Sequence, residues 1–144
     1  MNKFKNFILY VGLLSVLGAI PAVAQIAHSV TFDAPSEFYA GNARMPAGSY
    51  RVTQPDVDSS LLLVETVDGS HSAFVEYDVA STNTTHAQSD VTFNKYGNVD
   101  FLSAIWVEGR KSEMQILQSK FEQNTAKAAA AKKHSLSAKS AGQP

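Results

Sequence analysis

Two glutamates on either side of a central turn have the spacing best suited to hydrolytic chemistry. Glu65 and Glu76 flank Asp68-Gly69, so pairing of the two flanking strands could bring their carboxylates close together. Glycoside hydrolysis uses such a pair, one as acid and the other as nucleophile or base. The alternative is two solvated acids on a hairpin, because like charges usually stay in water. The sequence therefore keeps a hydrolase as an alternative and predicts no catalytic residue.

The histidines give little support for metal chemistry. They are His28, His71, His86 and His134. No two of them are two or four residues apart, and the chain has no cysteine. Asp56-x-Asp58 resembles the start of a calcium loop but lacks the glycine and distal glutamate of that motif, so a solvated turn is the better interpretation. We predict no metal site and no cofactor, and the G-x-S-x-G motif of serine hydrolases is absent.

Aromatic residues recur at strand spacing along the chain. We expect them to be core residues, because aromatic side chains bury large areas in β proteins; the set is Phe32, Phe38, Tyr50, Phe74, Tyr77, Phe93 and Phe101. Trp106 is the expected exception, because alternation places it opposite Phe101, Ile105 and Val107. An exposed tryptophan would suit contact with a sugar or a protein partner. Trp106 is therefore the one candidate binding residue.

The elements that would position these residues are short strands. Apolar and polar residues alternate from Ile26 to Phe32. Asp68-Gly69 and Gly97-Asn98 each separate two strand-like runs, which is a strong hairpin signal. Tight turns between successive strands favour antiparallel pairing. We predict an all-β fold, a single antiparallel β-sandwich or barrel-like domain of about seven or eight strands.

The first 24 residues have the pattern of a secretory signal peptide. Lys3 and Lys5 precede an apolar run over residues 7–20, and Ala22-x-Ala24 supplies a small-residue cleavage site before Gln25. A run of roughly 14 residues is shorter than the about 20 that a membrane-spanning helix needs. We therefore expect cleavage near Ala24-Gln25, export to the periplasm or the medium, and no transmembrane segment in the mature chain. The lack of cysteine excludes disulfides and a lipid-modified cysteine.

Charge divides the exported part into an acidic body and a basic tail. Residues 25–119 contain five Lys or Arg residues against twelve carboxylates, whereas residues 120–144 contain five lysines and one glutamate. An acidic body argues against nucleic-acid binding. We predict a β domain over residues 25–118 and an Ala/Lys-rich tail over residues 119–144. The tail is expected to be helical to about residue 133 and disordered beyond it, either as an inert end or as a weak tether to anionic envelope polymers.

Two segments together resemble a known family. Residues 41–52 read G-N-A-R-M-P-A-G-S-Y-R-V, and residues 93–106 read F-N-K-Y-G-N-V-D-F-L-S-A-I-W. They are similar to the G-N-x-x-L-P-A-G-x-Y-x-V and F-x-x-Y-G-x-x-x-F-L-S-x-x-W segments of small secreted proteins abundant in acidobacteria-type bacteria, with Met45 in the place of leucine. The resemblance implies a single exported β domain. It supplies no activity and no catalytic residues.

The leading functional hypothesis is an exported, non-catalytic β domain that binds a cell-envelope polymer or protein, or has a structural role there. The alternative is a small carbohydrate-binding module or hydrolase that uses Trp106 or the pair Glu65 and Glu76. A third hypothesis is a subunit that completes its sheet by edge pairing with another chain.

Overall fold

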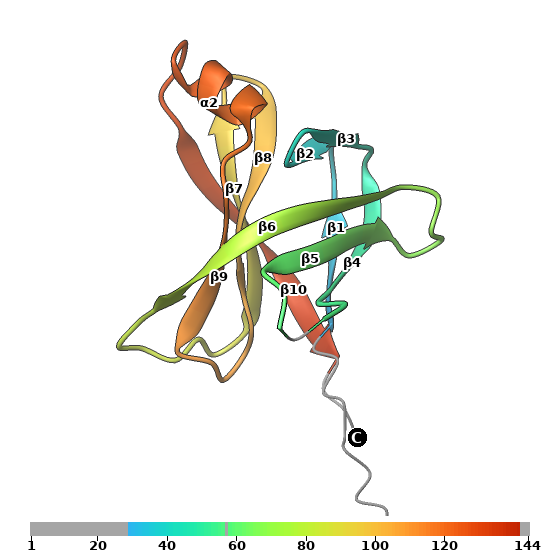
Figure 1. Ribbon diagram of the computed structural model, residues 1–144, viewed down its shortest axis with the longest axis vertical. Coiled ribbons are helices and arrows are strands. Elements are labelled where there is room, and N and C mark those ends of the chain that lie inside the picture. Colours follow the sequence, from blue (N-terminus) through green and yellow to red (C-terminus); the bar gives the residue numbers. More distant parts are fainter. Residues whose placement is uncertain (1–28, 57, 142–144) are drawn as a thin grey trace, which may run out of the picture.

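The structure is a computed structural model that describes residues 29–56 and 58–141 (Figure 1). The predicted signal peptide, its cleavage site and His28 lie outside the described residues. The described elements are β1 (Ser29–Ala34), β2 (Phe38–Ala40), β3 (Ala43–Met45), β4 (Gly48–Thr53), β5 (Leu61–Thr66), β6 (Ser72–Ser81), β7 (Ser89–Tyr96), β8 (Val99–Trp106), β9 (Ser112–Ile116), α2 (Lys120–Ala126) and β10 (Lys132–Ala141).

Eight of the strands form a closed antiparallel barrel. Their order is β8-β7-β10-β1-β4-β5-β6-β9, and β9 pairs back with β8 to close the sheet. The short hairpin of β2 and β3 is attached outside this circuit, because Tyr39 of β2 pairs in parallel with Phe101 of β8. The predicted all-β, antiparallel, barrel-like fold is confirmed. Closure pairs every barrel strand on both sides, so among the described strands only β3 keeps an unpaired edge.

Glycine turns form both predicted hairpins. Gly69 has φ 75° between β5 and β6, and Gly97 has φ 63° between β7 and β8. These left-handed conformations are ones that residues with a Cβ adopt at a cost. In the first turn, the backbone N–H of Gly69 donates to the carbonyl oxygen of Thr66 at 2.8 Å. Local sequence therefore determines which strands are neighbours at these two places.

Aromatic rings fill one end of the barrel core. Phe38, from the β2–β3 hairpin, lies 4.9 Å from the ring of Tyr50 and 5.3 Å from that of Phe93. Phe32 stacks on Tyr50 at 5.5 Å. All four side chains are at least 97 % buried. The expectation of an aromatic core is met at these positions.

One of the aromatic residues expected in the core lies on the surface instead. Phe74 is 62 % exposed, because its partner in the register is Leu63 and both point away from the barrel interior. Val75, its neighbour along β6, is the residue that points inward. The alternation of polar and apolar residues does not determine which face of β6 points inward, because hydrophobic residues occupy both faces of the hairpin.

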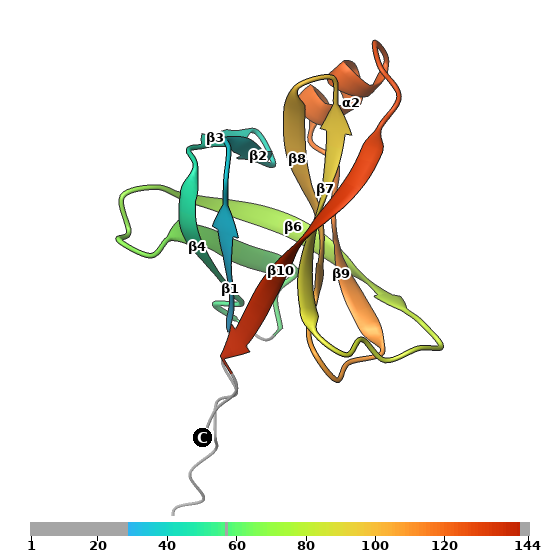
Figure 2. The same cartoon turned by 180° about the vertical axis from the view of Figure 1, so that it is seen from behind.

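The predicted tail differs most from the structure. Residues 120–126 are helical, as expected, but Lys132–Ala141 is strand β10, lying between β7 and β1 (Figure 2). The division at residue 119 therefore does not separate a tail from the β domain. The expectation of disorder was wrong because β7 and β1 each present an edge that β10 satisfies with backbone hydrogen bonds, which require few apolar side chains.

Side chains also attach β10 to the barrel. Leu136 and Ala138 pack against the core, and the ring of His134 stacks on Phe93 at 5.4 Å. His134 Nε2 donates to Oδ1 of Asp100 at 2.7 Å, and the Asp100 side chain is 8 % exposed. His134 therefore joins the last strand to β8, which is not its neighbour in the sheet.

The helix α2 covers the outer face of β8 next to the β2–β3 hairpin. Phe121 of α2 lies 5.4 Å from Phe101 and 4.8 Å from Tyr39, ring to ring. Ser119 caps the helix, its Oγ accepting the backbone N–H of Glu122 at 3.1 Å. No helix in the described ranges is long and apolar enough to cross a membrane.

Candidate functional site

A polar groove lies on the outer face of β7, β8 and β9. Ala104 is at its centre, paired with Thr92 of β7 on one side and Gln115 of β9 on the other. The small side chain of Ala104 leaves a hollow between longer neighbours, with a volume of about 350 Å³. The residues that line it are Thr92, Asn94, Ser103, Ala104, Trp106, Glu113, Gln115, Ile116, Gln118 and Lys133.

A β-bulge shapes the floor of this groove. The register between β7 and β8 shifts after Thr92, which leaves Ser103 as the extra residue of β8. Ser103 Oγ donates to the carbonyl oxygen of Thr92 at 3.1 Å and so holds the bulge. In a regular strand, residues three positions apart point to opposite faces. Because Ser103 is an extra residue, Phe101 and Ala104 both lie on the outer side of the barrel. The bulge therefore places α2 and the groove on the same face of the barrel.

Trp106 lines one end of the groove, where the sequence placed its candidate binding residue. One ring face stacks on His86, with the ring centroids 3.6 Å apart and the planes at 8°. The loop that carries His86 is held in turn by the backbone N–H of Gly109, which donates to the carbonyl oxygen of His86 at 3.0 Å. Since one face is covered, the indole contributes its remaining surface to the groove in a fixed orientation.

Asn94 lines the other end and is the polar residue that sequence reasoning missed. It is only 9 % exposed, and its Nδ2 donates to Glu122 Oε1 at 3.0 Å. Its Oδ1 is buried and has no hydrogen-bond partner in the described part of the chain. Exchanging the two amide atoms would point an oxygen at the Glu122 carboxylate, so the hydrogen-bond network fixes this orientation. Asn94 Oδ1 is therefore an acceptor without a donor among the described residues, and it has almost no surface open to the groove.

Glu122 is the buried centre of this network. It is 3 % exposed, and Tyr96 also donates its hydroxyl to Glu122 Oε1 at 3.1 Å. Burial, followed by the charge of Glu122, raises the pKa of Tyr96. The Ser119-x-x-Glu122 spacing is a capping-box pattern and could have indicated the helix start. Nothing local could have indicated that this glutamate binds residues of β7.

The rim of the groove carries one charge of each sign. Lys133 makes no ion pair within residues 29–56 and 58–141, and Glu113 accepts a hydrogen bond from Gln115 Nε2. Of the described residues that line the groove, Glu113 is the one carboxylate. Side-chain amides and hydroxyls supply the remaining polar groups, and these can both donate and accept hydrogen bonds.

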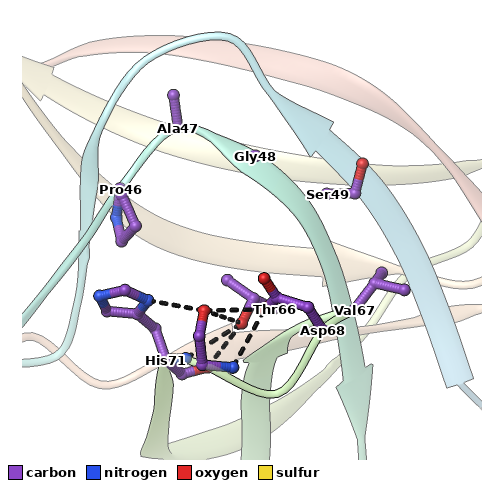
Figure 3. Close-up of a pocket in the computed structure, with 9 residues that line it drawn as sticks. Pro46, Ala47, Gly48, Ser49, Thr66, Val67, Asp68 and His71 are labelled. Carbon is purple, nitrogen blue, oxygen red and sulfur yellow. Dashed lines mark hydrogen bonds between the residues drawn. The ribbon is translucent and has the colours of Figure 1, made fainter.

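A second hollow, of about 470 Å³, lies beside the β5–β6 turn (Figure 3). In it Ser70 Oγ donates to Asp68 Oδ1 at 2.7 Å and lies 3.1 Å from His71 Nδ1. The serine is thus between the acid and the histidine, whereas a catalytic triad needs the histidine between the other two. The backbone N–H of Ser70 is the largest cause of a lowered pKa at Asp68, about 2. These contacts stabilise the turn.

The carboxylates predicted as a possible hydrolytic pair are far apart. Glu65 pairs with Ser72 and Glu76 pairs with Leu61, so the two acids lie at opposite ends of the β5–β6 ladder. Four residues along a strand correspond to about 13 Å, more than the separation in glycosidases. The structure does not bring Glu65 and Glu76 together.

The other residues considered from the sequence have local contacts. Asp56 Oδ1 accepts the backbone N–H of Asp58 at 3.0 Å, as in an Asx turn. His71, His86 and His134 lie at separate places, in the second hollow, against Trp106 and on β10. In the described ranges no three His, Cys, Asp or Glu side chains form a group that could hold a metal ion.

Comparisons of the chain with protein-family models, with curated proteins and with solved structures found no match, so its likeness to the small secreted family stays a prediction from the sequence.

Proposed function

We propose that the chain is an exported, non-catalytic binding domain that holds a carbohydrate of the cell envelope in the groove over Ala104. The observation that carries this proposal is the groove itself, about 350 Å³ in volume, in which Trp106 lies beside side-chain amides and hydroxyls. An aromatic surface next to groups that both donate and accept hydrogen bonds suits a ligand with apolar faces and hydroxyl groups.

The lining of the groove matches the chemistry of a sugar. Hydroxyl groups both donate and accept hydrogen bonds, as do the side chains of Thr92, Ser103 and Gln115. The ring of Trp106 offers an apolar surface for the C–H face of a pyranose. The opposite charges of Glu113 and Lys133 leave the groove without a strong preference for a charged ligand.

The barrel interior is a poor alternative site. Some eight-stranded barrels hold a small ligand inside, but here Phe32, Phe38, Tyr50 and Phe93 fill one end of the core. The hollow bordered by Phe38, Phe93 and His134 has about 20 Å³, room for a single water molecule. The outer groove is therefore the better place for a ligand.

The arrangement favours binding over hydrolysis. Hydrolysis of a glycosidic bond needs two carboxylates on either side of the bond. Glu113 stands alone among the described groove residues, and Glu65 and Glu76 belong to another surface. A carbohydrate-binding role needs no such pair.

A fluorescence titration tests the proposal, because Trp106 is the one tryptophan of the chain. Mature protein is titrated with neutral oligosaccharides and with envelope polysaccharide fractions. We expect a saturable change in emission that weakens at least fivefold in Gln115→Ala. The control is Glu65→Gln, which alters a residue outside the groove and should leave the titration unchanged. No saturable change with any sugar, or equal titrations for the two variants, would overturn the proposal.

A further inference from the structure

We propose that copies of this chain associate head to tail, with Phe74 of one copy inserted into a hollow over Thr31 on the next copy. The two surfaces lie on different sides of the barrel, so each copy can use both at once. This interaction goes beyond the proposed carbohydrate function, because no residue lines both this hollow and the groove over Ala104.

Phe74 projects from an apolar surface on the outside of β5 and β6. It is 62 % exposed, and Leu63, its partner in the register, points to the same side. Glu76 shares this face, with Leu61 opposite it and the backbone N–H of Leu117 donating to its carbonyl oxygen at 2.9 Å. Leu117 is itself 43 % exposed. A group of large apolar side chains on the surface indicates a place of protein contact.

Every charged side chain on the three strands around Phe74 is acidic. The strands β5, β6 and β9 contain no lysine or arginine, and their carboxylates are Glu65, Glu76, Asp78 and Glu113. Glu76 and Asp78 follow Phe74 at alternate positions of β6, so they lie on its side of the sheet. The surface that receives Phe74 must therefore be basic, because like charges that meet at an interface cost free energy.

A hollow of about 400 Å³ on the outside of β10, β1 and β4 supplies a basic surface. Its cations are Arg51 and Lys139, which the register places on either side of Thr31. Neither forms an ion pair within the part of the chain that the structure describes. Asp33, the one carboxylate among the described lining residues, accepts a hydrogen bond from Ser49 Oγ at 2.5 Å. Both cations can therefore pair with carboxylates of a neighbouring copy.

Val67 gives the hollow an apolar side for the phenyl ring. It is 53 % exposed and lies next to β4, where its backbone N–H donates to the carbonyl oxygen of Ser49 at 3.0 Å. The aliphatic stems of Arg51 and Lys139 offer further apolar contact. A cation over the face of an aromatic ring adds electrostatic attraction. The hollow thus matches both the ring of Phe74 and the carboxylates beside it.

Phe74 cannot occupy the hollow of its own copy. The strands β4 and β5 lie between β1 and β6 in the barrel, a separation of three strand spacings or about 14 Å around a convex surface. β6 faces the viewer in Figure 1, whereas β1 and β10 do so in Figure 2, where the molecule is seen from behind. Contact between two different surfaces repeats from copy to copy, so it builds chains or rings.

Sedimentation velocity of the mature protein at increasing concentration tests the proposal. We expect self-association that weakens at least tenfold in Phe74→Ser and also in Arg51→Glu combined with Lys139→Glu. Val79→Ser is the matched control and should associate like the wild type, because Val79 is 63 % exposed on the same strand but points to the other face. Association should also weaken at roughly 1 M NaCl, where the screening length is about 3 Å.

A mixture of the two weakened variants distinguishes head-to-tail contact from a symmetric dimer. The Phe74→Ser protein keeps the hollow and the charge-reversed protein keeps Phe74, so the mixture should form a one-to-one dimer and nothing larger. Circular dichroism checks that both are folded, and Lys139→Glu alone replaces the double variant if that is unstable.

Three results would overturn the head-to-tail contact. They are a wild-type protein that is monomeric at millimolar concentration, a Phe74→Ser protein that associates no more weakly than Val79→Ser, and a mixture that stays monomeric. The carbohydrate proposal would stand in each case, because none of these substitutions alters a residue of the groove over Ala104.

Discussion

Asn94 donates from Nδ2 to Glu122 Oε1 at 3.0 Å, although the two residues are 28 positions apart in the chain. This hydrogen bond attaches the helix α2 to β7 at the end of the outer groove. It also fixes the Asn94 amide so that its oxygen remains without a donor. Helix docking and the orientation of the Asn94 amide therefore depend on the same pair.

Replacing Glu122 tests how much this residue contributes to the stability of the fold. Glu122→Ala removes the acceptor of both Asn94 Nδ2 and the Tyr96 hydroxyl, which are buried or nearly so. We expect the free energy of unfolding to fall by about 2 kcal/mol or more, since each unsatisfied buried group costs roughly 1–3 kcal/mol. Urea denaturation measures this. Glu122→Gln keeps one acceptor and should lose less, and equal stabilities of all three proteins would contradict the network.

Truncation tests whether β10 is part of the barrel. A chain that ends at Ala131 lacks β10 and exposes the edges of β1 and β7. We expect it to lose cooperative thermal unfolding by circular dichroism or to aggregate, because unpaired edges associate. The matched control ends at Ala141 and should melt like the full mature chain. A truncated protein that ends at Ala131 and keeps the same melting temperature would show that residues 132–141 are not part of the barrel.

Acid stability tests the turn at Asp68. The pKa of this carboxyl is lowered to about 2 from 3.8, so its ionised form stabilises the fold fully above pH 3.8. That contribution is lost as the pH falls through 2. We therefore expect Asp68→Asn to be less stable than the wild type at pH 5 and to approach it at pH 2, measured by urea denaturation at each pH. A stability difference that is the same at both pH values would contradict stabilisation of the turn by the ionised carboxylate of Asp68.

The stacked pair at the groove is tested by removing the imidazole. His86→Ala uncovers one face of Trp106, and aromatic stacking contributes about 0.5–1.5 kcal/mol. We expect a shift in tryptophan emission to longer wavelength and weaker sugar binding, because the indole is less well fixed. His71→Ala, in the second hollow, is the control and should change neither. An unchanged emission spectrum of His86→Ala would argue against the stack.

Export is tested by the N-terminus of the protein recovered outside the cytoplasm. We expect it to begin at Gln25, because Ala22-x-Ala24 provides the small residues that signal peptidase requires. Leucine at both positions 22 and 24 should leave the precursor uncleaved. Intact precursor in the cytoplasm as the main form of the natural protein would contradict export.

Local signals in the sequence were enough for the hairpins and for much of the core. Asp68-Gly69 and Gly97-Asn98 form turns in which each glycine has positive φ, and that requirement is visible in the sequence. Trp106 was singled out because alternation placed it on the outer face, and it does line the groove.

Long-range pairing was not visible in the sequence. Residues 132–141 have little apolar surface, and their strand structure depends on two neighbours that come much earlier in the chain. The bulge at Ser103 arises from a register shift that no turn residue marks. In the sequence Asn94 looks like any other polar residue of a strand, because its hydrogen-bond partner, Glu122, is distant in the chain.

The most direct test of the account is a ¹H–¹⁵N NMR titration of the mature protein with the neutral oligosaccharide that binds most tightly in the fluorescence titration. We predict that the side-chain amide signals of Gln115 and Gln118 and the indole signal of Trp106 shift together and saturate at one binding constant. Shifts confined to residues 66–71 around the second hollow, or no shifts at millimolar sugar, would contradict a carbohydrate site in the groove over Ala104.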